Sequence, residues 1–236
     1  MYDLGIIGGM GPESTAEIFT KIIKLTWANR DQDHMKICLL NKTEVPDRTD
    51  YLLGNGESPL PYILEGIDEL ESLKTKHFII PCNTAHIFAD HFKKRKNITF
   101  IDMVEETRNF LKEKKVNRIC LLATNGTVAA KVYEDADNED YFKLIYPSED
   151  LQKEVMEIIL SVKSASKSNL ENKRRLINIM REVHNQHGDY TFVIACTELS
   201  TILADETISG IKFVDAMEIL AINAIIKCGY KLDIER

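Results

Sequence analysis

The sequence predicts an α/β protein built from two similar, doubly wound parallel-sheet modules related by pseudo-two-fold symmetry. Short continuous apolar runs alternate with amphipathic stretches along the chain, which is typical of buried parallel strands covered by helices on both faces. Three landmarks of the first half also recur in the second half, in the same order and at nearly the same separation, and indicate an internal duplication. The matching pairs are Leu4–Gly11 with Ile119–Gly126, Phe78–Thr84 with Phe192–Glu198, and Phe100–Met103 with Phe213–Ala216.

The apolar runs are expected to form strands, because each is short and lies between polar or glycine-containing segments. Right-handed crossovers between consecutive strands would place four strands in each half. The expected strands cover residues 3–8, 36–41, 77–81, 98–101, 118–123, 143–146, 191–195 and 211–214.

Amphipathic patterns between these runs predict helices. Pro12 directly follows Gly11, and proline is favoured in the first turn, so a helix is expected to begin there. The segment 42–58 contains prolines and glycines and is expected to be an irregular loop, long enough to act as a lid. The expected helices cover residues 12–29, 59–75, 84–96, 102–115, 127–136, 148–165, 169–187, 197–205 and 216–228.

The duplication also predicts how the chain is divided. The N-terminal module would comprise residues 1–102 plus 215–236 and carry Cys82, since the last segment is expected to pack back on the first half. The C-terminal module would comprise residues 103–214 and carry Cys196. Because ligands of open parallel sheets bind beyond the carboxyl ends of the strands, the active site is expected in the cleft between the modules.

The composition excludes several classes of protein. The chain of 236 residues is 44% hydrophobic and 28% charged, with a formal charge of −7, so it lacks the basic surface of general nucleic-acid and membrane-surface binders. Its apolar runs are too short to span a membrane. The chain begins with a strand-like segment rather than a signal sequence, so a cytoplasmic protein is expected. Its five widely spaced cysteines form neither a disulfide framework nor a CxxC metal pair.

Cys82 and Cys196 are the candidate catalytic residues. Each follows a buried strand and precedes small polar residues that open a helix, and a helix N-terminus favours a thiolate. Two thiols on opposite sides of one cleft suit removal of a proton from one face of a carbon and its return from the other. The remaining cysteines, Cys38, Cys120 and Cys228, are expected to be structural.

Three other side chains could contribute to the site, and two of them, Arg48 and His86, also have a second interpretation. Arg48 in the long loop could clamp a carboxylate or pair with a neighbouring aspartate on the surface. Glu198 and His86 lie close in sequence to the two cysteines and could tune a thiol, although His86 could equally bond only near its helix start. The run Gly9–Ser14 is close to the dinucleotide fingerprint GxGxxG, but a proline inside it removes an amide. A turn that presents amides to a small carboxylate is the plainer interpretation.

Several motifs together resemble the aspartate/glutamate racemase family over about residues 3–228. They are Gly8-Gly9-Met10-Gly11-Pro12, Pro46-Asp47-Arg48-Thr49, Pro81-Cys82-Asn83-Thr84-Ala85-His86, Leu121–Thr127, Cys196-Thr197-Glu198-Leu199 and Asp215–Leu220. Members of that family invert an amino-acid α-carbon with two opposed thiols, without pyridoxal phosphate or a metal. The presence of both cysteines is what makes the resemblance specific.

The resemblance implies reversible racemisation of aspartate, or of a related acidic amino acid such as glutamate, with Cys82 and Cys196 as the acid/base pair and no cofactor. Arg48 would hold the side-chain carboxylate, and Lys163 would be its partner. Relatives are commonly dimers, so a homodimer that binds neither nucleic acid nor a membrane is expected. The residues expected to line the carboxylate and ammonium pockets are Met10, Asn83, Thr84, Thr124, Thr127 and Thr197.

Two alternatives remain open at this point. A relative on the same fold could run another carbanion reaction, such as isomerising or decarboxylating a diacid. A protein of a different class, a non-catalytic thiol redox sensor, would instead join the two cysteines in a reversible disulfide, which requires α-carbons within ~7 Å.

Overall fold

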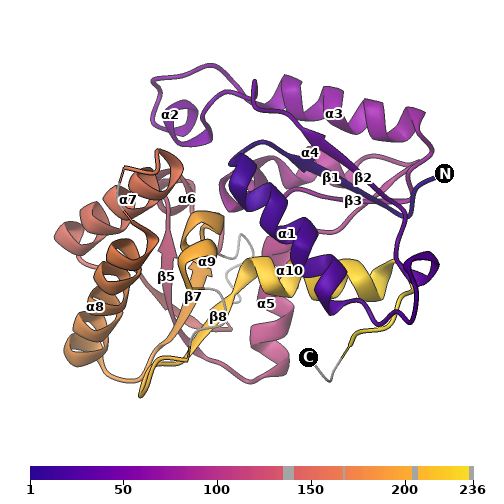
Figure 1. Cartoon of the computed structure of the whole chain (residues 1–236). Helices are drawn as coiled ribbons and strands as arrows, with labels where there is room; N and C mark the ends of the chain where they lie inside the picture. The colour runs from indigo at the N-terminus through magenta and orange to yellow at the C-terminus, as the bar shows by residue number, and fades with distance from the viewer. Residues whose placement is uncertain (135–140, 167, 204–206, 234–236) are drawn as a thin grey trace.

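The computed structural model describes the whole chain apart from residues 135–140, 167, 204–206 and 234–236. Its strands form two four-stranded parallel sheets with the orders β2-β1-β3-β4 and β6-β5-β7-β8 (Figure 1). The first sheet contains β1 (Leu4–Gly8), β2 (Ile37–Asn41), β3 (His77–Ile79) and β4 (Thr99–Phe100), and the second contains β5 (Arg118–Ala123), β6 (Lys143–Ile145), β7 (Thr191–Ala195) and β8 (Phe213–Asp215).

The two sheets share one topology, which confirms the predicted fold class. In each half the first strand lies between the second and the third, and every pairing is parallel. The central strands β1 and β7 are almost entirely buried, because helices cover both faces of each sheet, and this is why they read as continuous apolar runs. Strands β3 and β7 hold equivalent positions, so the chain segments that follow them, at Cys82 and Cys196, are equivalent too.

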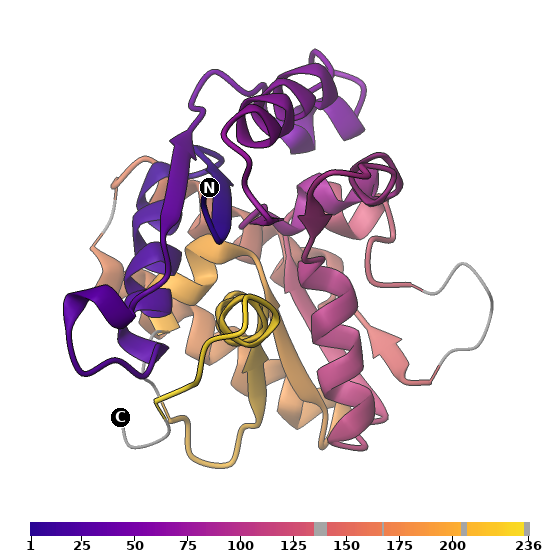
Figure 2. The same cartoon turned by 90° about the vertical axis from the view of Figure 1, so that its right-hand side faces the viewer.

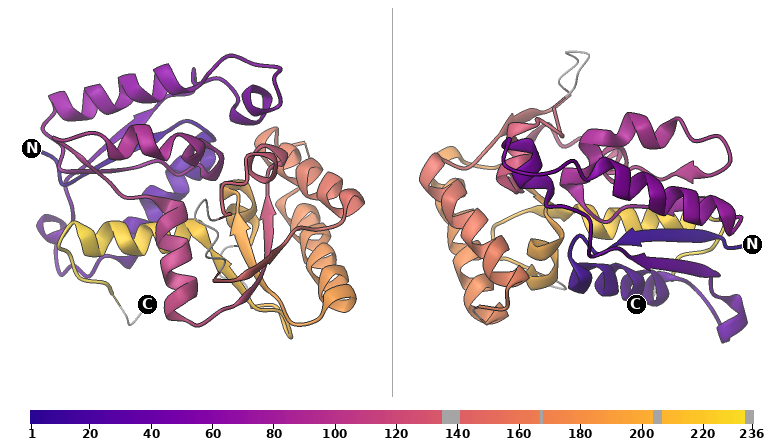
Figure 3. Two further views of the ribbon diagram at one scale, coloured as in Figure 1. Left: turned by 180° about the vertical axis from the view of Figure 1, so that it is seen from behind. Right: turned by 90° about the horizontal axis from the view of Figure 1, so that it is seen from above.

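Helices cover the faces of both sheets. In the view from above in Figure 3, β1 and β2 lie at one side of the molecule and α7 and α8 at the other. The longer helices are α1 (Pro12–Leu25), α3 (Leu60–Ser72), α5 (Met103–Glu113), α7 (Glu149–Lys163), α8 (Asn169–His187), α9 (Thr197–Leu203) and α10 (Ala216–Lys227). The short ones are α2 (Arg48–Leu52), α4 (Ala89–Lys93), α6 (Asn125–Ala129) and the 3-10 segments η1 (Asp31–Asp33) and η2 (Asn83–Phe88).

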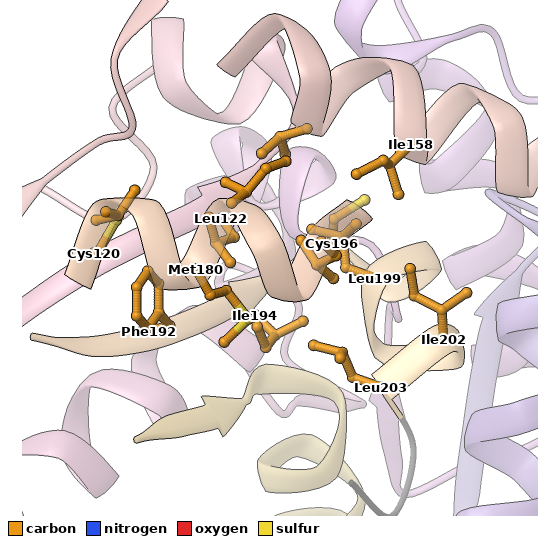
Figure 4. Packing of buried hydrophobic residues seen from close by; sticks show 14 of the residues in the cluster. Cys120, Leu122, Ile158, Met180, Phe192, Ile194, Cys196, Leu199, Ile202 and Leu203 are labelled. Atoms are coloured by element: carbon orange, nitrogen blue, oxygen red, sulfur yellow. The ribbon is translucent and has the colours of Figure 1, made fainter. Parts of the chain in front are cut away.

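Each sheet has an apolar cluster on both faces. In the second sheet, Phe192 and Ile194 of β7 point toward α7, α8 and α9, and Figure 4 shows them with Leu122 and Met180 in one packed group. The opposite face of this sheet packs against Tyr133 and other apolar residues. Each fully buried side chain of this size stabilises the fold by about 1.5–3 kcal/mol relative to its exposed state. These clusters fix the strand ends from which the candidate site is built.

The long segment 42–58 is not entirely irregular, because it contains the short helix α2. Asp47 caps this helix: its carboxylate accepts hydrogen bonds from the N–H groups of Thr49 and Asp50, at 2.8 and 3.1 Å. Aspartate is among the preferred N-cap residues, and Arg48 follows it as the first helical residue. The expectation of a wholly irregular loop was therefore wrong at this point.

Three predicted helix boundaries were also wrong, each because of a local hydrogen bond. After Cys82 the chain forms the 3-10 segment η2 rather than an α-helix, since the Cys82 carbonyl accepts from the Ala85 N–H and the His86 ring. Helix α6 begins two residues early because the Thr124 side chain caps it, and the end of the helix expected there lies outside the described residues. Helix α1 ends at Leu25, because the N–H and the hydroxyl of Thr26 both donate to the Ile22 carbonyl in the last turn.

Helix α10 joins the two halves of the molecule. Its apolar residues Met217 and Leu220 pack in one cluster with Ile18 and Ile22 of α1, and it also packs against α5, as the end-on view of α10 in Figure 2 shows. The last helix therefore packs against elements of both halves of the chain. Among the described residues, no helix is both long and apolar enough to cross a membrane.

Candidate active site

One pocket of about 300 Å³ collects residues from both halves of the chain at the carboxyl ends of the strands. Ten of its lining residues are ones that the sequence singled out: Met10, Arg48, Cys82, Asn83, Thr84, Thr124, Lys163, Cys196, Thr197 and Glu198. Sequence reasoning did not assign a role to the other three, Asp47, Thr49 and Ala195. Two predicted site residues, Thr127 and His86, do not line the pocket but lie directly behind residues that do.

The two cysteines reach this pocket from equivalent points of the two sheets. Cys82 precedes η2 and is 7% exposed, and Cys196 precedes α9 and is 5% exposed. All five cysteines are free. The surroundings of the two pocket thiols differ, because the Cys196 Sγ donates to Glu198 Oε2 at 3.0 Å, whereas no hydrogen bond to the Cys82 Sγ exists within the described part of the chain.

Cys196 is a protonated thiol rather than a thiolate at rest. Burial raises its pKa well above the usual range, and the Glu198 carboxylate beside it raises the pKa further. Figure 4 shows Cys196 among the apolar side chains of the second sheet, which accounts for the loss of hydration. The expectation that a helix N-terminus lowers the pKa of this thiol was wrong, because desolvation outweighs the helix dipole here. Burial alone raises the pKa of Cys120, in the same cluster, to about 12.

Glu198 links the second thiol to the rest of the site. Its Oε2 accepts from Cys196 and from the Thr197 hydroxyl, at 3.0 and 3.4 Å, while its buried Oε1 has no partner. A carboxylate in this position can take the thiol proton. Gly11 permits the approach, since a Cβ there would lie 2.8 Å from Glu198 Oε1.

Asn83 is oriented by a residue that sequence reasoning missed. The hydroxyl of Tyr133, a fully buried side chain, donates to Asn83 Oδ1 at 2.6 Å. This bond assigns the amide oxygen to Tyr133, and the buried Asn83 Nδ2 is left without a partner. Tyr133 lies after α6, fifty positions away along the chain, and nothing in its local pattern marks it as part of the site.

Three threonine hydroxyls form a closed, buried triangle across the two halves. Thr84 lies 3.0 Å from Thr124 and 2.8 Å from Thr127, and the latter two are 3.0 Å apart. Each hydroxyl has one proton to donate, so a bound carboxylate can accept from Thr84 or Thr124 only when the triangle rearranges. Thr127 completes the triangle from behind.

Arg48 points into the buried loop rather than toward an aspartate. Its guanidinium donates to the carbonyls of Val45, Pro46 and Met10, at 3.3, 3.0 and 3.1 Å. No carboxylate within ion-pair distance of Arg48 is found among the described residues, and its buried Nε has no partner. The alternative of a surface arginine paired with an aspartate was therefore wrong.

Lys163 brings the end of α7 to the same pocket. Its Nζ lies 3.6 Å from Asp47, the residue that caps α2. Burial opposes its charge, but the negative charges of Glu198 and Asp47 nearby raise its pKa. Lys163 is therefore a cation under all ordinary conditions, and a second positive charge faces the pocket beside Arg48.

His86 supports the backbone of Cys82 and does not touch the thiol. Its Nε2 accepts from the Met103 N–H at 3.1 Å, so its Nδ1 carries the proton and donates to the Cys82 carbonyl at 2.9 Å. Burial lowers the pKa of His86, which keeps the ring neutral. Of the two interpretations of His86, local hydrogen bonding near its helix start is the one observed.

A second cavity of about 570 Å³ adjoins the pocket and shares Met10, Arg48, Lys163 and Glu198 with it. Among the described residues, no group of three or more His, Cys, Asp or Glu side chains is arranged to hold a metal ion. The arrangement thus offers two thiols, a carboxylate, two cations and a set of hydroxyl and amide groups around one space.

Comparison with known proteins gives a consistent result. The model of the Asp/Glu/hydantoin racemase family matches residues 7–224. The broad specificity amino-acid racemase RacX of Bacillus subtilis is 26% identical over 226 residues, which cover 94% of this chain and 96% of RacX.

Among solved structures, Picrophilus torridus aspartate racemase superposes with a TM-score of 0.83 and is 33% identical, covering 98% of this chain and 96% of its own. The glutamate racemase RacE1 of Bacillus anthracis shares the fold, with a TM-score of 0.60 and 16% identity over 93% of this chain and 79% of its own.

Proposed function

Because the chain belongs to the Asp/Glu/hydantoin racemase family and is therefore a racemase, an isomerase, we propose that it interconverts L- and D-aspartate, or a closely related acidic amino acid. Cys82 and Cys196 are the acid/base pair in this proposal. The Picrophilus torridus relative, an aspartate racemase that is 33% identical to this chain, supports aspartate.

One observation carries the proposal: three buried polar atoms of the pocket residues have no hydrogen-bond partner. Two are donors, Arg48 Nε and Asn83 Nδ2, and one is an acceptor, Glu198 Oε1. Buried polar atoms are nearly always satisfied, so such a set marks groups that a ligand completes. The two donors suit carboxylate oxygens and the acceptor suits an ammonium group, which is the pattern of an acidic amino acid.

The two cations favour a substrate with two carboxylates. Lys163 and Arg48 both line the pocket, and Asp47 alone lies within ion-pair distance of either among the described residues. One carboxylate of the substrate could bind at these cations, and a bidentate arginine contact would fix its orientation. The threonines and Asn83 would receive the other carboxylate.

The chemistry needs one thiolate and one thiol at the start of each turnover. The thiolate takes the α-proton from one face of the carbon, and the thiol on the other face supplies its proton to the carbanion, so the two residues exchange roles. Glu198 can take the Cys196 proton and so prepare that thiolate, with the positive charge of Lys163 nearby. Amide and hydroxyl donors around the α-carboxylate would stabilise the carbanion.

α-Proton exchange in deuterium oxide tests the proposal. L- and D-aspartate and L- and D-glutamate would each be followed by NMR without any added cofactor, for the wild type, Cys82→Ser and Cys196→Ser. Cys38→Ser is the matched control, because this half-buried thiol does not line the pocket. We expect exchange with inversion in the wild type and control, and its loss in both pocket variants.

Silence of the wild type on all four amino acids would contradict the proposal. A diacid isomerase or decarboxylase, or a redox sensor, would then be favoured. Loss of two titratable thiols under mild oxidant, unaffected by amino acid, would identify the sensor. Inversion that persists in either serine variant would instead contradict the two-thiol mechanism.

Three further parts of the proposal concern the whole molecule: a homodimer, a cytoplasmic location, and two modules divided at residues 102 and 214. Light scattering coupled to size-exclusion chromatography tests the dimer, with a mass close to 27.0 kDa contradicting it. Limited proteolysis tests the division, since cleavage between modules is expected before cleavage within them.

A further inference from the structure

The geometry points to Gly126 as the residue that sets the length of the acidic amino acid that the pocket accepts. We propose that its missing side chain lets α6 and α2 approach so closely that a four-carbon diacid is favoured over a five-carbon one. This inference rests on the proposed function and names aspartate as the preferred substrate.

Gly126 lies where the two halves of the pocket touch. It is the second residue of α6, and the helix packs against α2 at this point. A Cβ built on Gly126 would lie 2.9 Å from the Thr49 Cα, 3.0 Å from its Oγ1 and 3.2 Å from its Cβ. The nearest of these atoms belongs to the backbone, so no rotation of a side chain could relieve the overlap.

Space, rather than backbone conformation, requires the glycine. Gly126 is not among the glycines with positive φ, and it lies in a helix, so an L-residue could adopt its backbone angles without strain. Alanine would even be the better helix former by about 1 kcal/mol. A glycine in this position therefore has a packing role.

The two helices that meet at Gly126 carry opposite ends of the proposed binding site. Arg48 begins α2 and precedes Thr49, and Thr124 caps α6 two residues before Gly126. In the proposed function, Arg48 holds the side-chain carboxylate and Thr124 lies with the groups that receive the α-carboxylate. The separation of α2 and α6 thus determines the distance between the two carboxylate positions.

Arg48 would move with its helix. Two of its three hydrogen bonds go to the carbonyls of Val45 and Pro46, within its own loop, and only one goes elsewhere, to Met10. In Gly126→Ala the new Cβ would lie 2.9 Å from the Thr49 Cα. An ordinary carbon–carbon separation of about 3.5–4.0 Å therefore requires the two helices to shift apart by roughly 0.6 Å or more. Aspartate and glutamate differ by one methylene, so such a shift is a substantial part of the difference.

Gly126→Ala tests this inference through substrate preference. We expect kcat/KM for L-aspartate to fall at least about tenfold relative to that for L-glutamate, since a displacement approaching 1 Å can reduce the rate by about a hundredfold and one methylene is worth about 10–200-fold. Competitive inhibition by succinate and glutarate should shift in the same direction. A role in folding alone would lower both substrates together and leave the ratio unchanged.

Gly66→Ala is the matched control. Gly66 lies in α3, outside the pocket, and a Cβ there would first meet the flexible Lys42 side chain, 3.0 Å from its Cδ. The aspartate-to-glutamate ratio should stay at the wild-type value. If Gly126→Ala does not fold, competitive inhibition of the wild type by succinate and by glutarate tests the proposed length preference, and succinate should bind more tightly.

The outcomes separate the two proposals. A wild type that racemises neither amino acid contradicts the proposed function itself. A wild type that is active but prefers glutamate or binds glutarate more tightly than succinate, or an unchanged ratio in the folded Gly126→Ala variant, overturns the role of Gly126 and leaves the racemase proposal standing.

Discussion

Removal of a single buried hydroxyl, in Tyr133→Phe, should affect both stability and substrate binding. The Tyr133 hydroxyl donates to Asn83 Oδ1 at 2.6 Å, and both side chains are buried. Phenylalanine keeps the volume of the ring, so no cavity forms. The variant therefore leaves the Asn83 carbonyl oxygen unpartnered inside the protein and frees the amide to rotate.

The expected magnitude follows from these two consequences. A buried acceptor left without its partner costs about 1–3 kcal/mol of unfolding free energy, and for a chain of this length each kcal/mol lowers the Tm by roughly 2–4 °C. The Tm should thus fall by about 2–12 °C. Because the Asn83 Nδ2 is no longer held toward the substrate, KM should rise by roughly two- to tenfold, the equivalent of one neutral hydrogen bond.

Calorimetry and racemisation kinetics check both values. Tyr141→Phe is the matched control, since it removes the same atom from an exposed tyrosine whose hydroxyl bonds the Lys112 carbonyl at 3.3 Å; its Tm and KM should remain at wild-type values. A Tyr133→Phe variant with an unchanged Tm and KM would refute the reasoning, because it would mean that the Asn83 amide is oriented by other groups.

Three further predictions concern ionisation and support of the site. Burial raises the pKa of Asp215 to about 6, above its value in the unfolded chain, so the free energy of unfolding should fall as pH rises from about 4 to 6. Asp215→Asn should therefore raise the free energy of unfolding by at most about 3 kcal/mol at pH 8 and leave it unchanged at pH 3, measured by urea unfolding. Glu198→Gln removes a charge that raises the pKa of Cys196, so alkylation of Cys196 in a Cys82→Ser background should begin at lower pH, with an unchanged profile contradicting the coupling. His86→Ala breaks two buried hydrogen bonds and should lower the free energy of unfolding by about 2–4 kcal/mol, measured by urea unfolding. A loss below about 0.5 kcal/mol would contradict the supporting role of His86.

Much of the fold could be predicted because buried elements show a recognisable pattern of apolar residues in the local sequence. Strands covered on both faces, such as β1 and β7, are continuous apolar runs, and the repeat of such runs gave the two equivalent sheets. The boundaries that were predicted wrongly depend on hydrogen bonds of individual side chains, such as the Asp47 carboxylate at the start of α2 and the Thr124 hydroxyl at the start of α6. No periodicity carries that information.

The candidate site divides in the same way. Cys82, Cys196 and Arg48 could be proposed because polar residues that follow strands meet at one edge of a parallel sheet. The raised pKa of Cys196 could not, because it depends on how deeply the thiol is buried and on the direction in which Glu198 points. The two thiols are equivalent in sequence and unequal in surroundings.

By itself, the sequence determined the class of fold, the duplication and the strand ends at which the two cysteines lie, since each depends on residue types at short spacings. Only the tertiary structure decided which distant side chains complete the site: Tyr133 on Asn83, Lys163 beside Asp47, and the close approach of Thr49 to Gly126. These contacts join segments that are far apart along the chain, so no local sequence pattern indicates that they meet. They depend on how the two halves of the chain pack against each other, because a hydrogen bond or a close packing contact is lost when the groups move apart by a few tenths of an ångström.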